Sequence, residues 1–404
     1  MTLDKGMKEL PALFSILESL KVPAHKSGAF KPIWEKDYFM EKAIRKAGGL
    51  NNWGDPEFVS GLKALLASIK QLPSTHFIGQ ITLHSLIIRS LINRLRFIEL
   101  LQKDTKNEVQ LNAPIIITGL SRSGTTFLQR LMAFDNRHYA FPLWELLDPY
   151  KNHGLFDLRR NKTNMEIILK NVLLPELDKK HYTRADTKEE CILLLANSFH
   201  SQLFTDIAPL AGYLDWYINE DREYAYREYR DQLKILQSFH RGKRLVLKAP
   251  SHLGSLEDLI KYIPDAIIIQ THRNPDECIN SLCSLRQTLF KMVEGEIDNQ
   301  EILREVLQLF DSETKKNLDF HKKYSDRVIS VSYKELTSKP MEILTGIYSK
   351  MNYEWTENMN NCMKQYIAEN PQNRRGKHNY NNNLVNNSMP KNIKIYAEFF
   401  KDYL

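Results

Sequence analysis

The stretch APIIITGLSRSGTTFLQRLM, residues 113–132, decides the fold of this 404-residue chain. Three consecutive isoleucines at 115–117 are typical of a strand buried on both faces of a parallel sheet. Apolar residues then recur at helical spacing over 128–132. The loop between them, 119–126, holds two glycines, which let successive N–H groups turn toward one ligand. Together with the partial positive charge at the start of the following helix, the loop predicts an anion-binding site.

The loop resembles the nucleotide P-loop G-x-x-x-x-G-K-[ST], but Thr125 stands where the lysine belongs, and the positive charge lies inside the loop on Arg122. A glycine turn between a core strand and a core helix would explain the glycines alone. The run is more similar to the 5′-phosphosulfate loop of sulfotransferases that use 3′-phosphoadenosine 5′-phosphosulfate (PAPS). That resemblance implies that Arg122, Ser123, Gly124, Thr125 and Thr126 bind the 5′-phosphosulfate of PAPS.

A second informative run is RLVLKAPSHLGSLEDLIKYIPDAIIIQTHRNPDECINSLCSL, residues 244–285. It predicts a strand at 245–247, a helix at 253–262, a strand at 266–270 and a helix at 276–285. Each strand ends in polar residues, and ligands of open parallel sheets bind at the carboxyl ends of the strands. We therefore expect these strand ends to lie beside the loop and to share its ligand.

Arg273 and Ser281 stand eight residues apart in this run, as R-x7-S. The spacing resembles that of the arginine and serine that hold the 3′-phosphate of PAPS in sulfotransferases, which implies the same role here. Arginine suits the role because its planar fork makes paired, charged hydrogen bonds to phosphate oxygens. The alternative is a surface ion pair of Arg273 with Asp276 or Glu277.

Four residues are candidates for the catalytic chemistry. Many sulfotransferases place a glutamate base shortly after the loop helix, and Glu145 matches that position best; its alternative is a solvated glutamate that opens the next helix. Lys248 resembles a lysine that lies beside the transferring group in related enzymes, and Arg122 would assist it. His252 is a rival base because imidazole titrates near neutrality.

Near the end of the chain, ENPQNRRGKHNY resembles the basic, glycine-containing loop that closes over the 3′-phosphate in related enzymes. This resemblance implies that Arg375 and Gly376 also bind the cofactor. The resemblance as a whole extends from residue 113 onward. It is strongest to bacterial-type sulfotransferases that carry an N-terminal helical region.

The expected fold class is α/β, with a P-loop-like parallel sheet flanked by helices, an N-terminal helical region and a helical insertion. We expect the helical region at 1–108 and the PAPS-dependent sulfotransferase domain at 109–404. Within that domain, the aromatic-rich helical insertion, about 151–241, is expected to cover the acceptor pocket.

Composition excludes several other classes of protein. The chain is 42% hydrophobic and 26% charged, which is ordinary for a soluble globular protein, and its net charge of +7 suits an anionic ligand without requiring nucleic acid. Four scattered cysteines form no metal-binding spacing and favour a reducing compartment. The most apolar helix candidate, 81–101, carries too many charges for a membrane span. We expect a cytoplasmic protein without a membrane span.

The resemblance implies transfer of a sulfuryl group from PAPS to a hydroxyl acceptor by in-line displacement, without a metal. The acceptor could be a small molecule, a carbohydrate or a lipid. One alternative is a P-loop kinase or NTPase, which needs Mg²⁺. Another is a nucleotide-binding protein without catalytic activity. The sequence leaves open the identity of the acceptor, the oligomeric state and the role of residues 1–108.

Overall fold

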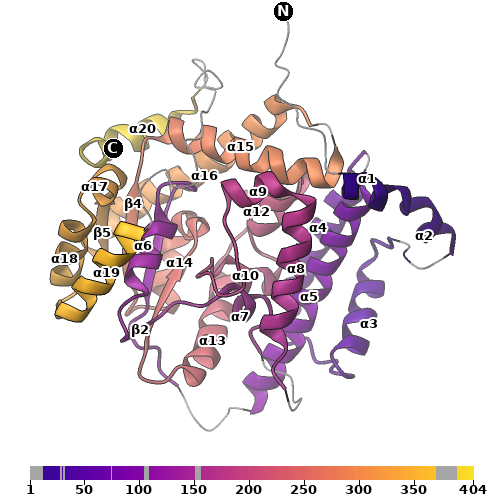
Figure 1. The fold of residues 1–404 in the computed structure, drawn as a ribbon, viewed down its shortest axis with the longest axis horizontal. Coiled ribbons are helices and arrows are strands. Elements are labelled where there is room, and N and C mark those ends of the chain that lie inside the picture. The colour runs from indigo at the N-terminus through magenta and orange to yellow at the C-terminus, as the bar shows by residue number, and fades with distance from the viewer. Residues whose placement is uncertain are drawn as a thin grey trace, which may run out of the picture.

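A central parallel sheet surrounded by helices forms the computed structural model of the chain (Figure 1). The model describes residues 12–27, 30, 32–73, 75–103, 109–150, 156–295, 297–369 and 389–404. The sheet has the strand order β2-β3-β1-β4-β5. Its strands are β1 Ile115–Gly119, β2 His138–Tyr139, β3 Arg244–Lys248, β4 Ile267–His272 and β5 Val328–Ser332. The expected α/β fold with a P-loop-like sheet is confirmed.

Strand β1 lies at the centre of the sheet because its isoleucines are apolar on both faces. Ile115 pairs with Val246 of β3 on one side and with Ile267 of β4 on the other. All five residues of β1 are buried. Alternate residues point to opposite faces of the sheet. Ile116 joins a cluster under α13 (Glu223–Phe239) and α14 (Leu256–Tyr262), whereas Ile115 and Ile117 join a cluster under α6 (Thr125–Met132) and α18 (Pro340–Lys350).

The first helices precede the sheet in the chain and lie at one side of the molecule, opposite α17 to α19 (Figure 1). They are α1 Ala12–Ser19, α2 Lys21–Ser27, α3 Lys36–Lys46, α4 Phe58–Lys70 and α5 Phe77–Lys103. The sheet then alternates with α6 Thr125–Met132, α7 Leu143–Leu147, α13 Glu223–Phe239, η2 Pro250–Ser255, α14 Leu256–Tyr262, α15 Pro275–Glu294, α16 Asn299–Tyr324 and η3 Ser325–Arg327.

Between α7 and α13 the chain forms one helix of 15 residues, α8, followed by shorter helices. They are α8 Arg159–Leu173, α9 Pro175–Lys180, α10 Ile192–Leu195, η1 Ala196–Ser198, α11 Leu203–Ile207 and α12 Ala211–Asn219. After the sheet come α17 Tyr333–Ser338, α18 Pro340–Lys350, α19 Glu357–Glu369, α20 Lys391–Phe399 and η4 Lys401–Tyr403. Within the described residues, no helix combines the length and the apolarity that a membrane crossing requires.

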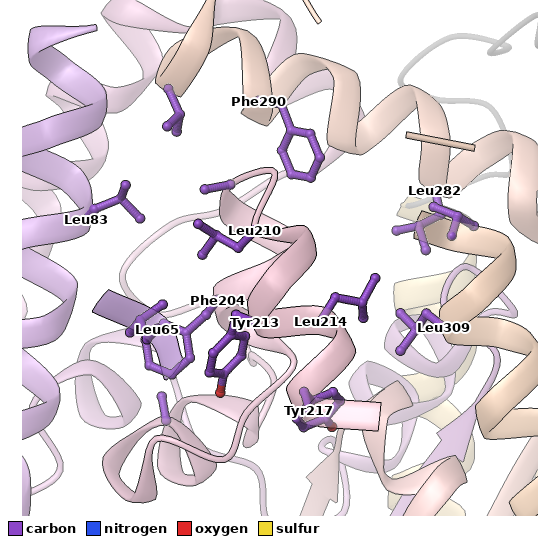
Figure 2. Packing of buried hydrophobic residues seen from close by; sticks show 14 of the residues in the cluster. Leu65, Leu83, Phe204, Leu210, Tyr213, Leu214, Tyr217, Leu282, Phe290 and Leu309 are labelled. Atoms are coloured by element: carbon purple, nitrogen blue, oxygen red, sulfur yellow. The ribbon is translucent and has the colours of Figure 1, made fainter. Parts of the chain in front are cut away.

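Helix α12 packs between the N-terminal helices and the helices that follow β4. Figure 2 shows its Tyr213, Leu214 and Tyr217 between Leu65 of α4 and Leu309 of α16. All five side chains belong to one buried cluster. The aromatic residues of this segment therefore fill the core, which is the more common role of aromatic side chains at helical spacing.

Candidate active site

The loop between β1 and α6 takes a conformation that ordinary residues rarely adopt. Gly119 and Gly124 have φ angles of 145° and 96°, and Arg122 lies in the left-handed region at 77°. A Cβ atom on Gly124 would lie 2.5 Å from the ring of Tyr333. Glycine is required there because only a residue without a side chain fits both the backbone angle and the space.

Hydrogen bonds hold this loop against the ends of the neighbouring strands. The hydroxyl of Ser123 lies 2.7 Å from the hydroxyl of Thr271 at the end of β4. Thr118 of β1 donates its hydroxyl to the backbone oxygen of Pro250, just beyond β3, at 3.2 Å. The loop is thereby fixed at the carboxyl edge of the sheet, where parallel sheets bind their ligands.

Three of the predicted cofactor-binding residues meet at this loop. The Nε of Arg122 donates to the hydroxyl of Ser281 on α15 at 2.9 Å, and Arg273 donates to the backbone oxygen of Arg122 at 3.0 Å. The guanidinium of Arg273 lies 4.5 Å from the ring centre of Tyr333 and 2.6 Å from the carboxylate of Glu277. The alternative ion pair with Glu277 is thus present, and it forms beside the loop.

Lys248 ends β3 and lies fully buried, with its Nζ 2.7 Å from a carboxylate oxygen of Glu190. The Glu190 side chain is 25% exposed and lines the cavity described below. A fully buried lysine needs a partner, and this carboxylate neutralises its charge. The pair places one cation and one possible proton acceptor at the same strand end.

Glu189, the neighbour of Glu190, also lines the cavity and is buried. Burial alone would raise the pKa of Glu189, but the charges of His181, Lys248 and Arg130 outweigh it and bring the pKa to about 2. So acidic a carboxyl group is a weak base near neutral pH. Of the two neighbouring glutamates, Glu190 has the side chain that is partly accessible in the cavity, so its position makes it the candidate for meeting an acceptor hydroxyl.

Glu145 lies apart from the loop and is not among the residues that line the cavity. Its carboxylate accepts a hydrogen bond from the hydroxyl of Tyr139 at 2.5 Å and lies 2.7 Å from Nε2 of His240. The rings of Tyr139 and His240 stack with their centres 3.6 Å apart. In this structure Glu145 is thus held by a structural network, and the structure does not bring it together with Lys248.

His252 is buried in the first turn after β3. Its Nδ1 lies 2.7 Å from the hydroxyl of Tyr226, and its Nε2 lies 3.3 Å from the sulfur of Cys191. Burial lowers the pKa of His252 to about 3. The ring is therefore neutral at physiological pH and is buried in the core; it is not itself among the residues that line the cavity.

One cavity of about 1000 Å³ begins at the loop and continues between helices. Its polar end includes Arg122, Gly124, Thr125, Thr126 and Arg273. The other end is mostly aliphatic, with side chains from α5, α8, α9, α11 and α15. These are Ile78, Ile81, Leu86, Ile167, Leu169, Leu173, Leu174, Leu177, Leu203, Ile207, Leu282, Leu285, Leu289 and Met292.

The expected insertion contributes to this cavity through its first half, from α8 to α11, whereas its tyrosines at 213–229 belong to the core. Arg375 and Gly376 lie outside the described residues, so their expected contacts with the cofactor stay a prediction. Within the described ranges, the histidine, cysteine and carboxylate side chains form no group of three or more that could hold a metal ion.

Comparisons with known proteins agree with this geometry. A family model described as the sulfotransferase family matches residues 114–357. The curated Omega-hydroxy-beta-dihydromenaquinone-9 sulfotransferases Stf3 of Mycobacterium bovis and Mycobacterium tuberculosis are each 24% identical over 277 residues, which is 63% of this chain and 67% of the relative.

Two solved structures are similar over almost the whole chain. Sulfotransferase STF9 from Mycobacterium avium has a TM-score of 0.80 at 23% identity and covers 93% of this chain and 97% of its own. Sulfotransferase STF1 from Mycobacterium tuberculosis has a TM-score of 0.77 at 23% identity and covers 92% of this chain and 100% of its own. At this identity the likeness shows a shared fold.

Proposed function

The chain belongs to the sulfotransferase family and transfers sulfuryl groups, and from this premise we propose that its donor is PAPS and its acceptor a hydroxyl group. The observation that carries the proposal is the joint placement of the anion loop, the Arg273–Ser281 pair and the Lys248–Glu190 pair at one edge of the sheet. One cavity connects the loop with Glu190 and with an aliphatic compartment.

The residues at this edge fit a donor with two separate phosphate groups. Loop amides, Arg122, Ser123, Gly124, Thr125 and Thr126 are available to a 5′-phosphosulfate at the start of α6. Arg273 and Ser281, which both contact Arg122, are available to a 3′-phosphate. Two arginines near one loop suit such a doubly charged nucleotide. Arg375 and Gly376 complete the proposed set.

When bound, PAPS supplies the activated sulfuryl group. We assign the proton of the acceptor hydroxyl to Glu190, which lines the cavity, in place of Glu145. A bond then forms from the acceptor oxygen to sulfur while the bond from sulfur to the phosphate oxygen breaks, and the nucleotide leaves with the electron pair. Arg122, which lines the cavity, stabilises the charge that grows on the leaving oxygen. Lys248 is buried against Glu190 and is not part of the lining, so its positive charge would act on the leaving oxygen from behind that carboxylate.

An acceptor with a long apolar body fits the rest of the cavity. Its lining beyond Glu190 is mostly leucine and isoleucine, which reward burial of hydrocarbon. The curated mycobacterial relatives are named for a hydroxylated menaquinone, a lipid-like molecule. We therefore propose a lipid alcohol as the acceptor, with its hydroxyl at Glu190 and its chain between α5, α8 and α15.

The donor is tested by thermal unfolding of the full chain without magnesium. We expect 3′-phosphoadenosine 5′-phosphate to raise the melting temperature, by a stabilisation of about 2.7 kcal/mol at 100 times its dissociation constant. ATP and adenosine 5′-phosphosulfate, which lack the 3′-phosphate, should have a smaller effect. Arg273→Ala should abolish the difference.

Arg241→Ala is the matched control, because Arg241 is exposed and does not line the cavity. It should retain the full stabilisation. No stabilisation of the unmodified chain, or a rise that needs magnesium and ATP, would overturn the assignment of PAPS and favour a phosphoryl transferase.

A further inference from the structure

The aliphatic end of the cavity reaches the molecular surface between α5 and α8. Ile81 of α5 and Leu169 of α8 both line the cavity, and yet they are 39% and 52% exposed. Leu17 of α1 lines the same end. Aliphatic side chains of the cavity lining are thus solvent-accessible at positions that do not belong to the polar loop.

Around this opening the surface is unusually apolar. Met165, Ile168 and Val172 follow one another at helical spacing along α8 and are 72%, 63% and 49% exposed. Ile16 and Leu20, in and just after α1, are 58% and 46% exposed. We call these five residues and Leu169 the α1–α8 face. Helix α1 packs against α8, so the two parts of the face adjoin.

Such a face is unfavourable in water, because covering an exposed apolar stripe on a helix lowers the free energy of the system. Within the described residues, most of the large apolar side chains that are exposed belong to α1, α2, the start of α5 and residues 156–172. These segments therefore hold the largest group of exposed apolar side chains, and the others are spread over the rest of the described chain.

The charges of the same helices favour an anionic surface as the partner. Helices α1, α2 and α8 together carry six lysines and arginines against two glutamates. On α8, Arg159 is buried against Asp157, and Arg160 and Lys162 are ion-paired with Asp186 and Asp148. The positive charge that these pairs do not offset comes from Lys21 and the exposed Lys26 of α2 and from Lys170 of α8. Basic residues beside an apolar helix face are the features that bind a protein to the plane of a membrane with anionic lipids.

We propose that the α1–α8 face docks on an anionic lipid bilayer and that the acceptor enters the cavity from that bilayer between α5 and α8. The hydrocarbon chain of the acceptor then stays covered from the membrane to Glu190. The entry route rests on the proposed function, whereas the docking of the face is independent of it.

Helices α5 and α8 are joined at the opening by an ion pair. Arg89 of α5 donates to the carboxylate of Glu166 of α8 at 2.6 Å, and both residues line the cavity. The pair is partly exposed, with 20% and 41% of the two side chains accessible. It fixes the separation of the two helices on either side of the proposed entry.

The test is cosedimentation of the full chain with vesicles of phosphatidylcholine, with and without phosphatidylglycerol. We expect binding that is stronger to the anionic vesicles and that weakens as salt is added. The variant Met165→Glu/Ile168→Glu should bind about tenfold or more weakly, since it removes two apolar side chains from the contact and adds negative charge.

The control variant is Ile395→Glu/Phe399→Glu on α20, which changes two apolar side chains that are 44% and 52% exposed and lie far from α8 in the chain. It should bind vesicles as the unmodified chain does. An unmodified chain that stays in the supernatant, or equal losses in the two variants, would overturn the proposal. So would a lipid-free dimer that only the α8 variant disrupts, because the face would then bind a second copy.

Stabilisation by 3′-phosphoadenosine 5′-phosphate, measured on the same variants, separates this proposal from the proposed function. Vesicle binding without nucleotide stabilisation would refute the PAPS assignment and support the docking. Nucleotide stabilisation without vesicle binding would refute the docking alone. With a vesicle-borne lipid alcohol as acceptor, the α8 variant should raise KM and leave kcat unchanged, and an unchanged KM would contradict the entry route.

Discussion

Glu190 and Glu145 compete for the role of general base, and their surroundings differ. Glu190 lines the cavity beside Lys248, whereas Glu145 is held by Tyr139 and His240. We expect Glu190→Gln to lower kcat about 10²- to 10⁴-fold, because an amide cannot take the proton of the acceptor. Single-turnover measurements of sulfuryl transfer from PAPS check this prediction.

Glu190→Gln leaves the buried Lys248 without its counter-charge and should lower the melting temperature of the free protein. The further rise on nucleotide binding should be unchanged, which separates a lost base from a lost binding site. The matched variant is Glu145→Gln, for which we expect a lower melting temperature and a much smaller effect on kcat. Full activity of Glu190→Gln together with a large loss in Glu145→Gln would return the role of base to Glu145.

The cofactor residues and the carboxylates differ in how far the sequence can predict them. Arg122, Ser281 and Arg273 follow from the spacing of two motifs, and the structure brings them within hydrogen-bond distance of one another at the loop. Glu190 meets Lys248 only through a contact across 58 residues of chain, and no spacing marks it. Glu189 and Glu190 together are typical of acidic residues at a capped helix start. The sequence therefore did not mark Glu190 as a site residue.

Among the helices, α16 carries a buried carboxyl group with consequences for stability. Neither oxygen of Glu313 has a hydrogen-bond partner within the described part of the chain. Burial raises the pKa of Glu313 to about 8, against the opposing charge of Arg222. The folded chain therefore binds this proton more tightly than the unfolded chain, and stability falls as the pH rises from about 4.5 to 8.

Glu313→Gln should remove this loss, because glutamine has a similar shape and no charge. We expect the melting temperature of the variant, relative to the unmodified chain, to increase steadily between pH 5 and pH 8. Glu342→Gln, at an exposed position of α18, is the control. It shows how the loss of an exposed carboxyl group changes the pH dependence of the melting temperature. If the melting temperatures of Glu313→Gln and of the unmodified chain changed with pH in parallel, the loss of stability would not come from the Glu313 carboxyl group.

Strands and helices with strong local sequence patterns form where they were predicted. Where the structure differs from the prediction, a contact with a distant part of the chain is the cause. The strands expected at 115–117 and 266–270 are present as β1 and β4. The expected helix at 253–262 is instead η2 followed by α14. Gly254 lies in η2 so close to α16 that a Cβ would be 3.2 Å from Glu313. A contact with a distant helix cannot be inferred from the local sequence.

At the scale of the whole molecule, the expected boundary near residue 108 does not divide the apolar core. One buried cluster contains Leu65 of α4, Leu83 of α5, Phe290 of α15 and Leu309 of α16 (Figure 2). Helices α4 and α5 lie in the region that was expected to be helical, and both contribute apolar side chains to the core. Periodicity shows which face is buried and gives no information on its partner, so the role of residues 1–108 could not be predicted.

The buried ion pair of Arg94 and Glu228 ties these N-terminal helices to the sheet domain. Arg94 of α5 is fully buried and donates to both carboxylate oxygens of Glu228 on α13, at 2.6 and 2.9 Å. It also donates to the backbone oxygen of Asp55 at 2.8 Å. Arg94→Met leaves Glu228 buried without its cation, which should lower the free energy of unfolding by about 3–5 kcal/mol.

Urea denaturation followed by tryptophan fluorescence and circular dichroism measures this loss. The double variant Arg94→Met/Glu228→Leu should recover most of it, because two apolar side chains can replace a buried ion pair once both charges are gone. A loss below about 1 kcal/mol in the single variant would mean that water or a rearranged side chain neutralises Glu228. Coincident transitions in both signals, in every variant, would follow from the shared core, since helices that share one buried cluster unfold together.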